Sequence, residues 1–270
     1  MEFFDSHAHY DDEKFDNDRF DIIEKIHSSG VTKFMSAGYN VTSSENGIKL
    51  VDEYDYIYTT SGISPNDVGT TIEDTEKEII KLTKIIKEYK LEKQKENKKD
   101  KIVGIGEIGL DYHWNSENKD IQIFAFEEQI KLANELELPI VIHTREAVMD
   151  TLEILKRNPV NKKGVFHCCP FNRELVKEAL KLDFYISVAG PVTFKNSKNA
   201  EEIINMIPLN RILIETDSPY LAPEPLRGTR NDSRNVQYIA QKISEIKNMK
   251  LEEIAEITYE NAKNIFNIKE

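Results

Sequence analysis

The sequence is poor in the residues that cross-link a chain or anchor it in a membrane. Among 270 residues there are two cysteines, Cys168 and Cys169, which are adjacent and cannot join distant elements. We interpret them as reduced packing residues of a cytoplasmic protein, because no Cys-His-Asn arrangement is evident. No apolar run approaches the roughly 18 residues of a membrane span. The opening MEFFDSHAHY lacks basic and apolar leader regions, so we expect no secretory signal and no membrane contact.

Negative charge exceeds positive charge. Lys and Arg number 36 against 48 Asp and Glu, which gives a net charge of −12. This balance argues against binding nucleic acid by broad electrostatic attraction, but not against holding a few phosphates through metal ions and local arginines. The length matches one (β/α)₈ barrel, and a monomer is the expected state.

Eight short segments rich in β-branched and apolar residues alternate with helical patterns. Runs such as Ile140-Val141-Ile142 suit parallel strands that are buried on both faces. Strict alternation predicts an α/β fold, a single-domain (β/α)₈ TIM-type barrel over residues 1–270. Two amphipathic helices, about 234–248 and 251–266, are expected to follow. The expected strands are 3–7, 33–38, 56–63, 102–110, 139–144, 164–169, 184–190 and 212–217.

The polar segment 87–101 interrupts this pattern. It is dominated by Lys, Glu, Asn and Gln. The simplest interpretation is a solvated end of the third helix or a mobile loop before the fourth strand. A basic arm that touches DNA is the alternative, although its glutamates dilute the charge.

Histidines and carboxylates gather at the predicted strand ends. Because residues i and i+2 of a strand project to one side, the first two histidines can point into one pocket. All strand ends of a barrel open on one face, so six potential ligands are expected to converge there. Imidazole and carboxylate suit Mg²⁺, Mn²⁺ or Zn²⁺. The six are His7, His9, Glu107, His143, His167 and Asp217.

Less specific interpretations exist for single residues. One His or Asp at a strand end is more often a hydrogen-bonding group than a ligand. Six together are different, because burying them without a cation costs several kcal/mol per unpaired charge. We interpret His27 as a surface residue and His113 as an ordinary loop histidine, with substrate contact as the alternative.

These motifs resemble the TatD-type deoxyribonuclease family, within the metal-dependent hydrolases of the amidohydrolase-like superfamily. The resemblance runs from Asp5 to Asn231, and ENAKNIF resembles the family's C-terminus. The matching stretches are DSHAHYDD, GEIGLDYHW, QIKLANELELPIVIHTREA, HCCPF, SVAGPVTFKN and LIETDSPYLAPEPLRGTRN.

The resemblance implies a binuclear metal site and DNA hydrolysis, typically as a 3′-to-5′ exonuclease. His7, His9 and Asp217 would hold one ion, His143 and His167 the other, and Glu107 would bridge them. Glu107 separates the chain from superfamily members that bridge their metals with a carboxylated lysine.

The chain departs from the family pattern at two places. Ser64 stands where the family usually has a histidine, and a hydroxyl is a poor metal ligand but can donate to a phosphate. HCCPFN replaces the Ser-Gly that many relatives carry after the aromatic residue, which changes the loop beyond His167.

The predicted reaction is attack of an activated water on phosphorus, with Asp217 accepting the water's proton. The predicted substrate is DNA that is single-stranded or has accessible 3′ ends. Two rival hypotheses stay open, an amidohydrolase acting on a cyclic amide or lactone and a non-enzymatic metal-loaded scaffold. Candidates for binding substrate phosphates are Arg145, Arg227, Arg230, Lys195 and Ser64.

Overall fold

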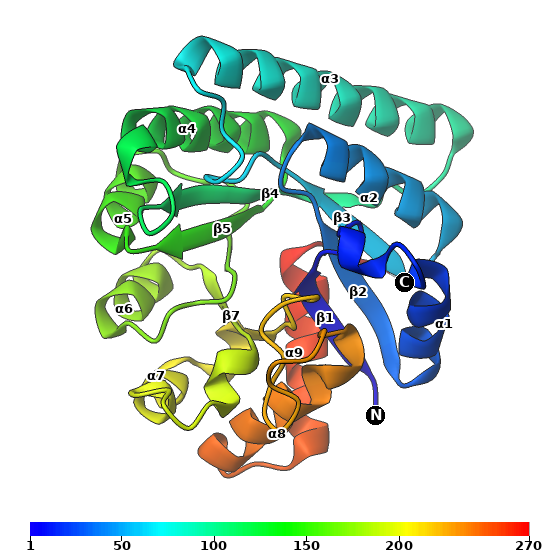
Figure 1. Cartoon of the computed structure of the whole chain (residues 1–270), viewed down its shortest axis with the longest axis vertical. Coiled ribbons are helices and arrows are strands. Elements are labelled where there is room, and N and C mark those ends of the chain that lie inside the picture. Colours follow the sequence, from blue (N-terminus) through cyan, green and yellow to red (C-terminus); the bar gives the residue numbers. More distant parts are fainter. Residues whose placement is uncertain (270) are drawn as a thin grey trace. The chain divides into compact units, whose positions relative to one another are not determined.

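The computed structural model describes residues 1–269 (Figure 1). Its eight strands form one sheet in chain order. The pairs β1–β2, β3–β4, β4–β5 and β7–β8 are parallel. Beyond β8 the chain returns to β1 through a parallel bridge between Ala8 and Ser218. This topology confirms the (β/α)₈ barrel. The strands are β1 (Phe3–Ala8), β2 (Val31–Ala37), β3 (Ile57–Ser61), β4 (Ile102–Asp111), β5 (Ile140–Arg145), β6 (Gly164–Phe166), β7 (Tyr185–Val188) and β8 (Ile212–Ile214).

The helices begin where the sequence supplies capping groups. Asn40 and Ser43 form a reciprocal capping box at α2, and the Thr71 hydroxyl caps α3. Within residues 1–269, no helix has both the length and the apolarity that crossing a membrane requires. The helices are α1 (Arg19–Ser28), α2 (Val41–Glu53), α3 (Ile72–Glu96), α4 (Lys119–Leu136), α5 (Val148–Arg157), α6 (Arg173–Lys181), α7 (Ala200–Met206), α8 (Val236–Lys247) and α9 (Leu251–Ile265).

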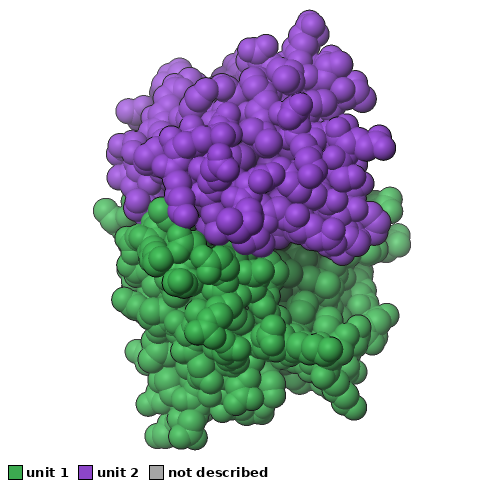
Figure 2. Space-filling model, turned by 90° about the vertical axis from the view of Figure 1, so that its left-hand side faces the viewer, with its two compact units in different colours: residues 1–36, 166–270 green, residues 37–165 purple. Residues whose placement is uncertain are grey.

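The chain divides into two compact units, Met1–Ser36 with Phe166–Glu270, and Ala37–Val165 (Figure 2). In the first unit, α9 packs against β1, β8 and α8, over a core that includes Phe4 and Phe34. In the second unit, α4 packs against β4 and α3, and α2 packs against β3. That residues 1–270 form a single domain stays a prediction.

The polar segment 87–101 is helical as far as Glu96, where α3 ends. The helix-end interpretation is therefore confirmed, but full solvation is wrong for two of its lysines. Lys93 is buried and pairs with Asp52 at 2.7 Å. Lys101 is buried and donates to the backbone oxygen of Val51 at 2.6 Å. Long side chains bury their methylenes when their heads find oxygen partners, and these heads are then not available to DNA.

Strands β6 and β8 end earlier than the sequence predicts, at Phe166 and Ile214. Cys168 has φ 37° and Asp217 has φ 55°, values that lie outside the extended region. The chain therefore turns before the predicted strand ends. His167 and Asp217 lie on the turns that follow their strands, whereas Glu107 and His143 lie within β4 and β5.

Candidate metal centre

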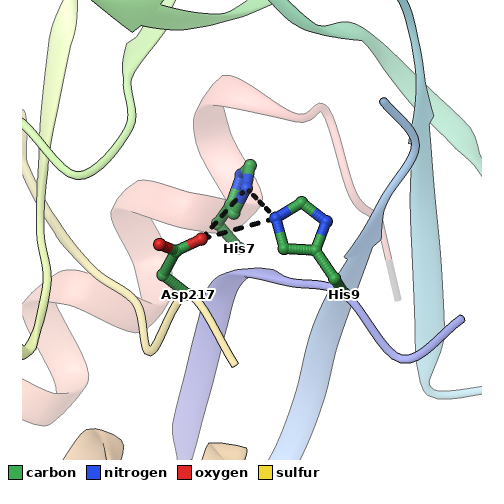
Figure 3. A group of neighbouring side chains, drawn as sticks. All are labelled: His7, His9 and Asp217. Carbon is green, nitrogen blue, oxygen red and sulfur yellow. Dashed lines mark hydrogen bonds and ion pairs between the residues drawn. The ribbon is translucent and has the colours of Figure 1, made fainter. Parts of the chain in front are cut away.

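In the first unit, the side chains of His7, His9 and Asp217 converge (Figure 3). The Nε2 atoms of the two histidines are 3.2 Å apart. The Oδ1 atom of Asp217 lies 3.4 Å from Nε2 of His9 and 3.7 Å from Nε2 of His7. Two atoms that bind one tetrahedral cation at about 2.1 Å lie roughly 3.4 Å from each other. The three donor atoms therefore fit one divalent cation.

Backbone pairing brings Asp217 to the end of β1. The N–H of Asp217 donates to the His7 oxygen at 2.9 Å, and the N–H of His9 donates to the Ser218 oxygen at 2.6 Å. The left-handed φ of Asp217 turns its side chain toward the histidines, a conformation that Asp tolerates better than most residues.

Asp5 joins the same two segments through hydrogen bonds. Its carboxylate accepts the N–H of Thr216 at 2.9 Å and that of His7 at 3.3 Å, together with the hydroxyls of Thr216 and Ser233. Burial raises the pKa of Asp5 to about 7, although these hydrogen bonds act in the opposite direction. Asp5 is thus a buried positioning group that joins β1 to the turn that carries Asp217.

His167 extends the cluster, because its ring stacks on that of His7 at a centroid distance of 4.0 Å. Its Nδ1 lies 3.4 Å from Oε1 of Glu215, an atom that also accepts the N–H of Cys168 at 2.6 Å. Glu215 is fully buried, and its Oε2 has no hydrogen-bond partner within the part of the chain described. His7, His167 and Glu215 form a second group with ligand atoms close enough to hold a cation. A buried acceptor beside two imidazoles fits a metal ion.

The second unit brings Glu107 and His143 together. Nδ1 of His143 lies 2.9 Å from Oε1 of Glu107, and Nε2 lies 3.0 Å from Oδ2 of Asp111. The imidazole is therefore held between two carboxylates. A ligating histidine commonly uses its second nitrogen in this way, to contact a carboxylate that fixes its orientation. Asp111 is the candidate for that positioning role, and Glu107 and His143 are the candidate ligands.

Two buried glutamines of α4 hold the loops that follow β3 and β4. Gln122 accepts the N–H of Asp111 at 2.9 Å and donates to the Asp111 and Asn115 oxygens. Gln129 accepts the N–H of Ile63 at 2.7 Å and donates to its oxygen at 3.0 Å. Each amide pairs with the backbone as a neighbouring strand would, which fixes the loops around the second cluster.

The electrostatics favour ionised carboxylates. Burial alone would raise the pKa of Asp217, but a hydrogen bond with His9 and the nearby histidine charges lower it below its usual value. Burial also opposes ionisation of Asp111, but hydrogen bonds from His143, the Trp114 backbone and other donors bring its pKa to about 2. Both groups are negative at neutral pH and attract cations.

The predicted phosphate-binding residues differ in their freedom to bind. Arg145, at the end of β5, is exposed, and so are Arg227 and Lys195. The Arg227 guanidinium lies 4.2 Å from the Phe194 ring centroid. Arg230 makes a two-point ion pair with Asp18, at 2.7 and 2.6 Å. Ser64 is buried and donates its hydroxyl proton to Asp67 at 2.7 Å.

Among the described residues, the two remaining histidines and Cys169 lie outside the groups of possible metal ligands. His27 is half-buried on α1, and His113 is exposed and pairs with Glu146 at 2.8 Å. Cys169 is buried, and burial raises the pKa of its thiol well above the usual range, as expected of a packing residue.

Sequence reasoning missed Asp111 and Glu215 because each lies outside the simple strand-end pattern. Asp111 is four residues beyond Glu107 on β4, and Glu215 is two residues before Asp217. The signal that could have found Asp111 is a second carboxylate four residues after a predicted ligand on one strand, which places both on the same side. For Glu215 it is a second carboxylate in the segment that carries Asp217.

Comparison with known proteins identifies the family of this chain. The family model described as TatD related DNase matches residues 4–267. YabD of Bacillus subtilis, named an uncharacterized metal-dependent hydrolase, is 41% identical over 98% of this chain and 99% of its own length. A second relative, from Buchnera aphidicola of Acyrthosiphon pisum, is also named an uncharacterized metal-dependent hydrolase. It is 36% identical over 99% of this chain and 100% of its own length. The crystal structure of YJJV, a TatD homologue of Escherichia coli, superposes with a TM-score of 0.88 over 99% of this chain and 98% of its own, at 24% identity.

The chain is a (β/α)₈ barrel with histidines and carboxylates within its strands or on the turns that follow them. Relatives that match 98% or more of it are named metal-dependent hydrolases, which defines its class. Within that class, the chain belongs to the TatD-related DNase family.

Proposed function

We propose that the protein is a metal-dependent deoxyribonuclease that hydrolyses phosphodiester bonds in DNA and removes nucleotides from accessible 3′ ends. The observation that carries the proposal is the convergence of His7, His9 and Asp217 on a cation-sized space. Family membership supports the substrate class. We propose further that it works as a cytoplasmic monomer, consistent with Cys168 and Cys169, neither of which is part of a disulfide among the described residues.

The proposal assigns two divalent ions to the six predicted ligands. His7, His9 and Asp217 would hold one ion, His143 and His167 the other, and Glu107 would contact both. Mg²⁺, Mn²⁺ and Zn²⁺ all accept imidazole and carboxylate ligands. When bound, such ions increase the acidity of water and neutralise charge on the phosphate.

The chain's own groups then divide the remaining work. Asp217 is ionised and can accept a proton from the attacking water. Asp111 holds His143 in position through Nε2. Arg145 can pair with a substrate phosphate, and Arg227 and Lys195 supply two further exposed cations. Ser64 could bind a phosphate only by giving up its bond to Asp67.

The decisive experiment combines metal analysis with cleavage of end-labelled single-stranded DNA in Mg²⁺ or Mn²⁺. The wild type should release nucleotides stepwise from the 3′ end. His143→Ala should keep the fold and nearly abolish cleavage, whereas His27→Ala on α1 serves as the matched histidine control and should cleave normally. If His143→Ala cleaved DNA at the wild-type rate, the proposed role of His143 in holding a second ion would be refuted.

A substrate panel separates the rivals. An amide, a lactone and a phosphotriester should be offered beside the DNA under the same metal conditions, because one fold hosts many reactions. Turnover of the amide or lactone without DNA cleavage would identify an amidohydrolase. No turnover of any substrate with any of the three metals would favour a binding scaffold.

A further inference from the structure

The single tryptophan of the sequence, Trp114, lies in an unusual place for so large an apolar side chain. It is 67% exposed on the loop after β4, three residues beyond Asp111. An aromatic ring of this size normally contributes its large apolar area to a core or an interface. An exposed ring next to a candidate metal centre therefore points to a ligand.

The loop that carries Trp114 is fixed rather than loose. Oδ1 of Asp111 accepts the backbone N–H of His113 at 2.9 Å and that of Trp114 at 3.1 Å. Gln122 donates to the Asn115 oxygen at 2.9 Å on the other side of the tryptophan. The same Asp111 carboxylate contacts His143 through Oδ2. One buried side chain thus fixes both the backbone of Trp114 and the imidazole of a candidate metal ligand.

Arg145 supplies a cation beside the ring. Its guanidinium carbon lies 5.3 Å from the Trp114 ring centroid, and Arg145 is the register partner of Asp111 across β4 and β5. Within residues 1–269, Arg145 forms no ion pair with a carboxylate, in contrast to Arg230. His113 meets the tryptophan edge-on at 4.7 Å. The loop presents an aromatic surface with one uncommitted positive charge.

We propose that Trp114 is a stacking platform for a nucleobase of the DNA strand, and that Arg145 pairs with the phosphate next to that base. The inference rests on the proposed deoxyribonuclease activity and adds a substrate contact to it. Aromatic side chains stack on any base, and a guanidinium binds a phosphate through two parallel hydrogen bonds. Such local contacts suit a chain of net charge −12, which cannot gather DNA by overall attraction.

The sole tryptophan makes the proposal directly measurable, because its fluorescence reports this loop alone. The holoenzyme is mixed in a stopped-flow instrument with a thymidine octanucleotide, or with a strand of equal length whose nucleosides are all replaced by base-free tetrahydrofuran. The thymidine strand should change the emission before any cleavage, and the base-free strand, which can reach only Arg145, should change it much less. Equal changes with both strands, or none with either, would overturn the stacking contact.

Kinetics provide the second measurement. Trp114→Ala should lower kcat/KM on the thymidine strand about 5- to 150-fold, which corresponds to the roughly 1–3 kcal/mol that stacking contributes per base. The loss on the base-free strand should be much smaller, and Trp114→Phe should recover most of the loss. Leu91→Ala, which removes a half-exposed side chain from α3, is the control.

The outcomes separate the two proposals. Suppose that the wild type cleaves DNA, but that Trp114→Ala keeps the wild-type kcat/KM or that its kcat/KM falls by the same factor on both strands. The stacking proposal is then wrong, and the proposed deoxyribonuclease activity is unaffected. A wild type that cleaves neither strand in any of the three metals refutes the nuclease and the platform with it. Because Trp114 is largely exposed, circular dichroism should show an unchanged fold in each variant.

Discussion

Replacing Gln129 by Leu removes the buried hydrogen bonds between its amide and the Ile63 backbone, which we call the clamp, and nearly preserves side-chain size. In the native protein, the amide of Gln129 accepts the Ile63 N–H and donates to the oxygens of Ile63 and Ala125, at 2.7, 3.0 and 3.1 Å. Gln129 and Ile63 are both buried. The variant therefore leaves a backbone donor and a backbone acceptor without their partner, in a place where water cannot easily replace it.

The expected cost follows from those two groups. Each buried backbone group left unpaired costs about 1–3 kcal/mol, so the two together cost roughly 2–6 kcal/mol. The leucine offsets part of this, because it no longer buries an amide. We expect a net loss of about 3 kcal/mol, which for a chain of this size lowers the melting temperature by roughly 6–12 °C.

Thermal and urea unfolding followed by circular dichroism measure the loss. Gln241→Leu is the matched control, because Gln241 is exposed on α8 and, among residues 1–269, its side chain donates a hydrogen bond only to Glu245, at 3.3 Å. The control should stay within about 0.5 kcal/mol of the wild type. A Gln129→Leu protein as stable as this control would show that the clamp contributes nothing and that the loop finds other partners.

Three further outcomes are expected. Asp111→Asn should reduce cleavage about 10–100-fold with the fold intact, because an amide cannot fully replace the carboxylate beside His143; activity within twofold of wild type would contradict this. Gly109→Ala should lower the free energy of unfolding by about 3 kcal/mol or more, because the added Cβ would lie 2.0 Å from the His143 backbone oxygen at a residue whose φ is 139°. Calorimetry measures this loss, and an unchanged melting temperature would be inconsistent with that contact. Chelation by EDTA should sharply weaken DNA binding measured by fluorescence anisotropy, because net charge −12 repels phosphates; equal affinity with and without chelator would argue against metal-mediated binding.

The sequence predicts the repeating architecture well because buried parallel strands leave a strong local pattern. Ile140, Val141 and Ile142 are all buried in β5, as their continuous apolar character indicates. The predicted last helix, 251–266, agrees with α9 to within one residue. These features depend on neighbouring residues, so one sequence suffices to find them.

The ends of strands and the supporting contacts are harder to predict. β6 and β8 stop early because Cys168 and Asp217 adopt left-handed backbone conformations that long-range packing selects. The clamp of Gln129 on Ile63 joins residues 66 positions apart, and no local pattern marks it. Candidate ligands could be named from their place at or near predicted strand ends, whereas the contact of Asp111 with His143 depends on the pairing of β4 with β5.

The bridge between Ala8 and Ser218 also bears on how the protein is made. His7 precedes Asp217 by 210 positions, so the ribosome adds Asp217 long after His7. An unfinished polypeptide that lacks Asp217 cannot assemble the triad, whatever part of it has already folded. The centre formed by His7, His9 and Asp217 can therefore mature only after Asp217 and Ser218 have been added.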